Sequence, residues 1–152
     1  MTEAAKLETE MAEASGLESV RQVFATDGAA RGIGRTMGIS GISAEPGVVT
    51  LQGSPTEDHY SPRGTVHGGY AATLLDAAIG LAVQSALPAG TGYATVDLKV
   101  TYVRSMTRES GPVVATGKII HCGKRMAASE ATLFDREGKL CAHATATCTI
   151  FR

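Results

Sequence analysis

The chain has 152 residues, 43% of them hydrophobic and 19% charged, with a formal net charge of −1 at pH 7. That length suits one domain with a substantial core, and the balanced charge gives no bulk reason to expect nucleic acid or an anionic membrane as partner. The acidic N-terminus has no apolar leader, and no uninterrupted apolar run reaches about eighteen residues, so we expect a cytoplasmic protein.

One or two short amphipathic helices are expected between residues 3 and 24. Apolar residues recur there at roughly helical spacing: Leu7, Met11, Leu17, Val20 and Phe24. Gly16 is the expected break. The apolar stripe is narrow, so these helices should lie on the domain surface and not build its core.

A glycine-rich stretch follows, in which Gly28, Gly32 and Gly34 match the phosphate loop of short-chain dehydrogenases. That loop needs a long helix directly after it, whereas TMGISGISAEPGVV brings more glycines and a proline. No tyrosine in the chain has the lysine four residues later that those enzymes use. We therefore interpret residues 1–34 as a helical extension with a loop, and 35–152 as the main domain.

The main domain alternates strand patterns with one helix. Strands are expected at 35–44 and 47–53, joined by a turn at 45–47, and a long helix at 68–87. Strand 93–103 alternates, with Val96, Leu98, Val100 and Tyr102 on one side and Thr95, Asp97, Lys99 and Thr101 on the other. Three more strands follow at 112–122, 125–134 and 140–151. One antiparallel sheet curled round one helix is the simplest α+β solution.

The helix at 68–87 carries the residues of greatest chemical interest. Asp76 is its only side chain that is charged at neutral pH, and apolar residues cover most of its circumference, so we expect the helix to be buried. A buried carboxylate is costly unless it is used or hydrogen-bonded. Gly68 and Gly69 leave backbone N–H groups free at the positive end of the helix, where an oxyanion would be stabilised. A carboxylate and an anion hole indicate hydrolysis.

The chain from residue 38 to 150 resembles hotdog-fold acyl-CoA thioesterases, in the branch of the phenylacetate-degradation and one type of 4-hydroxybenzoyl-CoA thioesterase. The main match is GTVHGGYAATLLD, where Asp76 stands nine positions after His67. TVDLKVTYVR, HCGKR and DREGKLCAHATAT also match. The resemblance implies a hotdog fold with an N-terminal helical extension.

The resemblance also implies roles for individual residues. Asp76 would attack the thioester carbonyl or activate the attacking water, and the N–H of Gly68, with that of Gly69, would hold the oxyanion. His67 would orient the loop and the carbonyl. Thr95, reaching across from a neighbouring subunit, would position the lytic water.

Substrate-binding positions implied in the same way are Ser61, Arg63, Arg104, Lys124 and Arg125, the last three near the coenzyme A nucleotide and phosphates. No metal or cofactor is implied, because coenzyme A is part of the substrate. Three positions depart from the family: Ser61 replaces an Asn, Ser105 a Pro after Arg104, and Gly80 a Thr that holds water in some members.

Simpler interpretations stand beside these. Asp76 could merely accept hydrogen bonds, His67 could be a loop residue, Thr95 could face a subunit interface, and Lys124 with Arg125 could be solvated charge. Cys122, Cys141 and Cys148 are odd in number and are expected to be buried free thiols. Neither His121-Cys122 nor Cys141-x-His143 has the spacing of a zinc site.

We expect a homodimer that joins two sheets edge to edge with acyl-CoA clefts between subunits, pairing further into a homotetramer, since the branch assembles that way. Small side chains such as Ala77 and Gly80 would leave room for an aryl or medium-chain acyl group. Two alternatives remain open: a hotdog dehydratase or hydratase acting on acyl thioesters, and a non-catalytic acyl-CoA binding protein.

Overall fold

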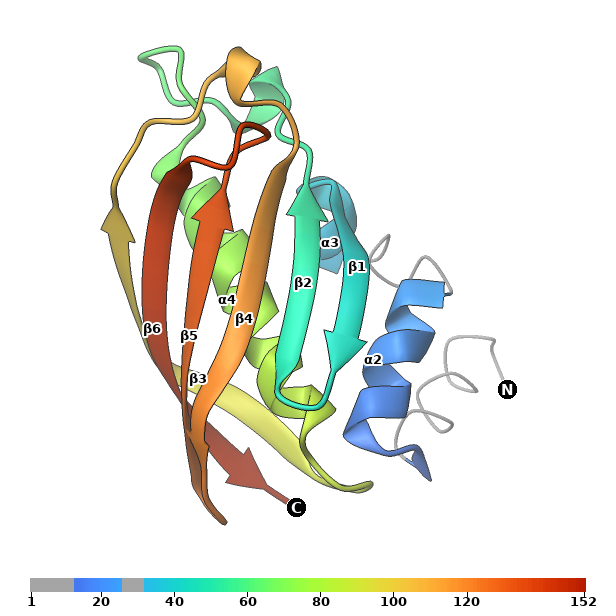
Figure 1. Ribbon diagram of the computed structural model, residues 1–152. Coiled ribbons are helices and arrows are strands. Elements are labelled where there is room, and N and C mark those ends of the chain that lie inside the picture. The colour runs from blue at the N-terminus through green and yellow to red at the C-terminus, as the bar shows by residue number, and fades with distance from the viewer. Residues whose placement is uncertain (1–12, 26–31) are drawn as a thin grey trace.

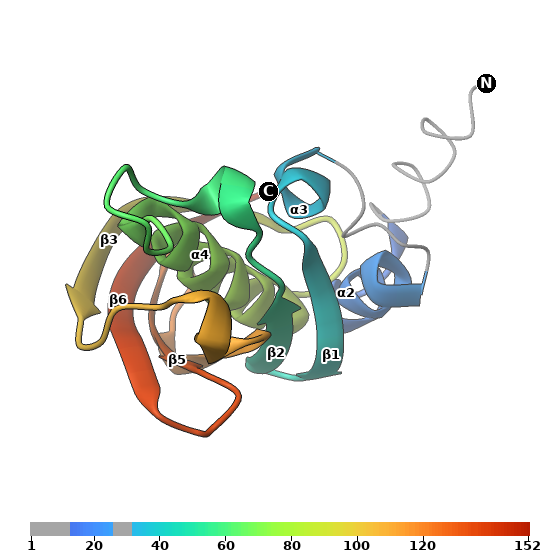
Figure 2. The ribbon, with the colours of Figure 1, turned by 90° about the horizontal axis from the view of Figure 1, so that it is seen from above.

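The computed structural model describes residues 13–25 and 32–152. Within them a six-stranded antiparallel sheet, in the order β1-β2-β4-β5-β6-β3, curls round one long helix (Figures 1 and 2). The strands are β1 (Ile39–Glu45), β2 (Val48–Gly53), β3 (Gly92–Tyr102), β4 (Val113–Cys122), β5 (Met126–Phe134) and β6 (Leu140–Phe151). The helices are α2 (Gly16–Ala25), α3 (Gly32–Thr36) and α4 (Gly68–Ser85), with short 3-10 turns η2 (Glu57–His59) and η3 (Arg108–Ser110). This is the expected hotdog architecture.

The core lies between α4 and the concave face of the sheet. Leu74, Leu75 and Ile79 of α4 are fully buried there. The helix approaches β4 so closely that a Cβ on Gly117 would come within 2.2 Å of the Ala78 carbonyl oxygen. The glycine therefore sets the distance between helix and sheet, because any side chain would push backbone against backbone.

One side of α4 is not covered, which corrects the expectation of a helix buried all round. Gly69 is exposed, and half-exposed residues continue from it at helical spacing: Ala72, Thr73, Asp76, Ala77, Leu81 and Gln84. We call these seven residues the open stripe. Gly80 lies on the same side but is buried. The sequence pattern hid this stripe because four of its residues are as apolar as those of the core: Gly69, Ala72, Ala77 and Leu81.

Strand β3 contains a bulge that overturns its expected alternation. Thr95 pairs with Cys148 and Asp97 with Thr147, so Val96 is an extra residue without a partner and is 62% exposed. The bulge reverses the facing of the residues before it, while Leu98 and Tyr102, which follow it, keep theirs. As a result Thr95 shares the concave side with Leu98, instead of pointing away from it.

The N-terminal region agrees with expectation in one way and differs in another. Gly16 marks the expected break, because Ala14 and Ser15 are not helical and α2 begins at Gly16, where a Cβ would meet the Gln84 carbonyl oxygen at 1.8 Å. Val20 of α2, however, is only 1% exposed and belongs to the core, because α2 packs against β1 and α4 and does not merely rest on the surface. Leu7, Met11 and Gly28 lie outside the described residues.

The glycine-rich stretch and the cysteines complete the comparison with expectation. Gly32 and Gly34 form the one-turn helix α3 where a loop was expected. Cys141 and Cys148 are buried free thiols as predicted, but Cys122 is exposed. Across residues 13–25 and 32–152, no helix has the length and apolar character needed to cross a membrane.

Candidate active site

The start of α4 is organised by His67. Its backbone is extended, with φ −62° and ψ 140°, and its Nδ1 accepts a hydrogen bond of 2.8 Å from the Gly69 N–H. A donor held in this way is not free for a substrate, so Gly69 does not supply the second oxyanion donor that was expected. The N–H of Gly68 has no acceptor in the part of the chain that the structure describes. Of the two expected oxyanion donors, the Gly68 N–H alone is free among the described residues.

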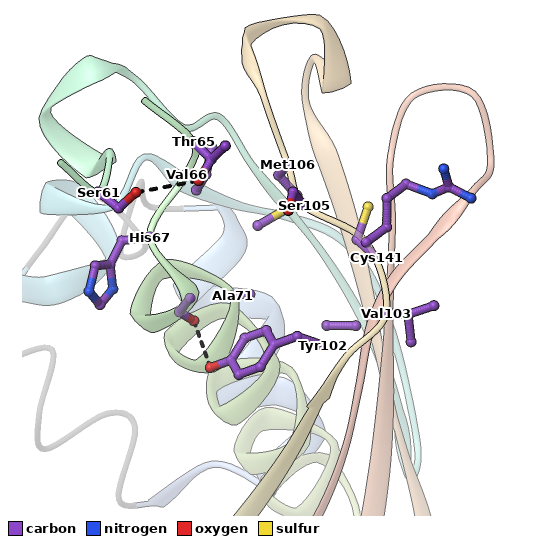
Figure 3. A pocket seen from close by; sticks show the side chains of 13 residues that line it. Ser61, Thr65, Val66, His67, Ala71, Tyr102, Val103, Ser105, Met106 and Cys141 are labelled. Atoms are coloured by element: carbon purple, nitrogen blue, oxygen red, sulfur yellow. Dashed lines mark hydrogen bonds between the residues drawn. The ribbon is translucent and has the colours of Figure 1, made fainter. Parts of the chain in front are cut away.

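A cavity of about 410 Å³ opens at this end of the helix. The Tyr102 hydroxyl donates to the Gly68 carbonyl oxygen at 3.0 Å and fixes β3 to the first turn of α4 (Figure 3). The His67 ring points away from the Tyr102 side of this cavity, as its cap bond requires (Figure 3). The mainly small or apolar lining includes Val66, Ala71, Met106, Cys141 and Ala142.

Asp76 stands midway along the open stripe and is held by Thr95. The Thr95 hydroxyl donates to Asp76 Oδ1 at 2.9 Å within the same chain. Thr95 was expected to reach across to a neighbouring subunit and position the lytic water there, whereas the Val96 bulge turns it toward the helix of its own chain. The second carboxylate oxygen, Oδ2, has no protein partner among the described residues. One oxygen is thus oriented and the other is available.

Gly68 and Asp76 of one chain are too far apart to act on one carbonyl group. They are eight residues apart on α4, which corresponds to about 12 Å along the helix axis. A nucleophile and an oxyanion donor must both lie within about 3 Å of the reacting group. A site that uses both residues would therefore need two chains, each supplying one half-site.

The basic candidates fall into two groups. Arg104 lines the cavity beside Gly68, where Ser61 Oγ lies 3.3 Å from Thr65 Oγ1. Arg63 is exposed, and its backbone N–H donates a hydrogen bond of 3.3 Å to Ser61 Oγ. The side-chain amide of the family's Asn has no equivalent here, because the Ser61 hydroxyl is engaged within its own loop.

Lys124 and Arg125 lie at the opposite end of α4. They border a second cavity of about 600 Å³ together with Arg152, Thr91 and Phe151. None of the three cations forms an ion pair with an acidic residue in the described chain. Arg152 could not be selected from the sequence, since it is the last residue and no motif includes it.

Burial and nearby carboxylates raise the pKa values of two groups close to Asp76, Tyr93 and Cys148. Burial, followed by the charges of Asp76 and Cys148, raises the pKa of Tyr93 to about 12. Burial also raises the pKa of the Cys148 thiol, and the charges of Asp76 and Asp97 add to this effect. Both groups therefore stay protonated, and so uncharged, at neutral pH. No three His, Cys, Asp or Glu side chains in residues 13–25 and 32–152 gather closely enough to hold a metal ion.

Tyr102 and the apolar part of the cavity lining were missed by sequence reasoning. Tyr102 reads as one more residue of an alternating strand, and only its contact with Gly68 gives it a role. Met106 and Cys141 come from separate segments that the fold brings together. The only signal in the sequence for a role of Tyr102 was that an aromatic residue with a polar hydroxyl stands on the apolar side of its strand.

Comparisons with known proteins agree with this geometry. The thioesterase superfamily model matches residues 63–142, more than half of the chain. Acyl-coenzyme A thioesterase 13 of Homo sapiens is 32% identical over 127 residues, covering 82% of this chain and 89% of that protein. The 1,4-dihydroxy-2-naphthoyl-CoA hydrolase of Listeria monocytogenes is 28% identical over 109 residues, covering 72% and 87%.

A solved structure gives the same fold. The E. coli PaaI protein from the phenylacetic acid degradation operon superposes with a TM-score of 0.79 at 19% identity, covering 91% of this chain and 97% of that one. At that identity the likeness concerns the fold alone. Taken with the family match and the human relative, the fold and the helix-borne carboxylate show that the chain belongs to the thioesterase superfamily, a family of thioester hydrolases.

Proposed function

We propose that the protein hydrolyses an acyl-CoA thioester to the free acid and coenzyme A. The observation that carries this proposal is the Asp76 carboxylate, placed on an open helix stripe and oriented by Thr95 at 2.9 Å. A thioester is an activated acyl donor, so a carboxylate and one anion-binding N–H suffice for its hydrolysis. Family membership and the relatives named as acyl-CoA hydrolases support the same reaction.

We propose that the two half-sites meet in a homodimer. Strand β3 pairs only with β6 within the described residues, so its outer edge is open. Tyr102 holds Gly68 near one end of β3, and Thr95 holds Asp76 near the other. A two-fold axis near Leu98 would set these ends side by side, bringing Gly68 of one subunit to Asp76 of the next. The expected edge-to-edge dimer therefore supplies the contact that one chain lacks.

The reaction in this composite site needs no added group. The Gly68 N–H binds the carbonyl oxygen as negative charge develops, and the Asp76 Oδ2 removes a proton from water. The water oxygen bonds to the carbonyl carbon, the carbon–sulfur bond breaks, and the proton passes to the leaving thiolate. If Asp76 is instead the nucleophile, its Oδ2 bonds to the carbonyl carbon, the thiolate leaves and takes a proton from water, and a second water attacks the Asp76 carbonyl carbon of the resulting anhydride to release the acid. A single turnover in heavy-oxygen water tests this second route, because only it places the label in Asp76.

The expected aryl or medium-chain acyl group fits the cavity beside Gly68 better than the space over Gly80. The phenol of Tyr93 lies against Gly80, so small helix residues do not leave that space open. The cavity of about 410 Å³ has an apolar lining from Ala71, Met106 and Ala142 and is the better place for an acyl group. Arg104 lies at the same cavity, while Lys124, Arg125 and Arg152, which have no acidic partner among the described residues, are suited to coenzyme A phosphates.

The test is thiol release from aryl, short-chain and long-chain acyl-CoAs by the native protein and by Asp76→Asn. We expect turnover by the native protein and a loss of orders of magnitude in the variant. Saturable acyl-CoA binding without turnover would favour a binding protein. A changed carbon–carbon double bond without thiol release would identify a hydratase or dehydratase.

The shared site has its own test. Asp76→Asn and Gly68→Pro, which removes the N–H, are each expected to be inactive. In a mixed dimer one site carries both changes and the other carries neither, so mixing and exchanging subunits should restore about a quarter of native activity. No recovery, despite exchange shown by mass spectrometry, would contradict a site built from two subunits.

A further inference from the structure

Tyr93 places a phenol hydroxyl on α4, one turn beyond Asp76. It is the second residue of β3 and precedes Thr95 by two residues, so both side chains lie on the concave side of the sheet. Because of the Val96 bulge, Leu98 lies on this side as well. A Cβ on Gly80 would come within 2.4 Å of the Tyr93 hydroxyl oxygen and 2.9 Å of Cζ. Only a glycine at position 80 allows this approach.

The Tyr93 hydroxyl is an unused hydrogen-bond donor. In the described chain it has no hydrogen-bond partner, in contrast to Tyr70 and Tyr102, which donate to the carbonyl oxygens of Met37 and Gly68. A half-buried Tyr hydroxyl normally finds a partner. Asp76 and Cys148 are the ionisable groups that act on it, and the charge of Asp76 helps to raise its pKa. The phenol thus remains a donor at neutral pH.

The spacing between phenol and carboxylate suits one bridging water. Asp76 and Gly80 are one helical turn apart, about 5.4 Å along the axis. Two hydrogen bonds of about 2.8 Å through one oxygen span a similar distance. Thr95 already occupies Oδ1 of Asp76, which leaves Oδ2 for this water.

We propose that Tyr93 is a positioning residue that holds the lytic water between its hydroxyl and the Asp76 carboxylate. The proposal rests on the thioesterase function above. It also explains the glycine at position 80, because any side chain there would prevent the Tyr93 hydroxyl of β3 from lying against the helix. The acyl group takes no part in this contact, so the effect of losing it is the same for every acyl group.

The kinetic test compares Tyr93→Phe and Gly80→Ala with the native enzyme, and uses Tyr60→Phe as the matched control. Tyr93→Phe removes only the hydroxyl, and Gly80→Ala displaces it while favouring the helix. We expect kcat to fall about tenfold in both, KM to change less than about twofold, and the loss to be equal across acyl chain lengths. A raised KM, or a changed order of substrates, would show a role in acyl recognition and overturn the proposal.

A second measurement does not depend on turnover. With 3-fluorotyrosine in all four tyrosine positions, the Tyr93 fluorine resonance is identified by its loss in Tyr93→Phe, and its pKa is followed by NMR. Asp76→Asn should lower that pKa toward the ordinary range, whereas Asp97→Asn, as a control, should change it little. If the native enzyme is active but the Tyr93 pKa is unchanged in Asp76→Asn, this inference is overturned. Absence of turnover in the native protein would instead contradict the proposed function.

Discussion

The two sides of α4 are built from similar residues but serve different purposes. Leu74, Leu75 and Ile79 face the sheet and are fully buried, while Thr73, Asp76 and Ala77 lie on the open stripe. The buried side determines whether the domain folds. The open stripe is covered by little of its own chain and carries the carboxylate. The residues expected to support folding and those expected to support catalysis thus lie on different sides of one helix. Substitutions of neighbouring residues can therefore test stability and activity separately.

Asp76→Asn should have the largest effect on activity and little effect on stability. The amide keeps the shape of the carboxylate and can still accept from Thr95, but it cannot take a proton or attack a carbonyl. We expect kcat to fall by about 10²- to 10⁴-fold. Thermal unfolding of the same preparation serves as control, and a large drop in its midpoint would mean that Asp76 supports the fold.

Leu75→Ala, one residue earlier, should show the reverse. Leu75 is completely buried between helix and sheet, so its truncation leaves a cavity. We expect the free energy of unfolding to fall by about 2–5 kcal/mol, measured by urea denaturation. The kcat of the folded fraction should stay close to native. Equal losses of both would show that the two sides of the helix are not independent.

Thr95→Val tests the support of the open stripe. Valine keeps the shape of threonine and suits a strand, but cannot donate to Asp76 Oδ1. We expect kcat to fall about tenfold, equivalent to about 1.4 kcal/mol. Thr95→Ser, which retains a hydroxyl, should recover most of this loss, and failure to do so would point to packing instead of the hydrogen bond.

The smallest expected effect is a pH dependence of stability that comes from two phenols, Tyr70 on the buried side of α4 and Tyr93 beside the open stripe. Burial raises the pKa of Tyr70 to about 12, as it does for Tyr93. Above pH 10 the unfolded chain loses phenol protons that the folded chain keeps, so stability should decline as pH rises from about 10 to 12. Tyr70→Phe should make this decline less steep, and should also cost about 1 kcal/mol at neutral pH by removing the bond to Met37. Urea denaturation across this pH range provides the measurement.

The sequence predicted the fold well because its elements have clear periods. The strand order and the helix follow from alternation and from glycine and proline at their ends, and the GTVHGGYAATLLD motif identifies the helix start. The side on which Thr95 lies could not be predicted. Val96 continues a regular apolar alternation, and only its lack of a partner in β6 reveals the bulge.

The site was predicted in part for a related reason. Asp76, His67 and Gly68 belong to one motif and were found together. Tyr93 was missed, and Gly80 was thought to leave room, because a glycine in a sequence does not show what fills the space above it. The occupation of the Gly69 N–H by His67 is likewise a matter of side-chain rotamer, which spacing alone does not fix.

The Val96 bulge has a consequence for insertions and deletions. Because Val96 pairs with nothing, a chain that lacks this codon would keep every partner that β3 has in β6, and Thr95 would still face α4 by simple alternation. Deletion of Ala94 or Leu98 would instead shift one segment of the strand against its partners. Within β3 this single codon is therefore the length change that evolution could make most easily, and related chains could differ here by one residue without losing the carboxylate's hydroxyl partner.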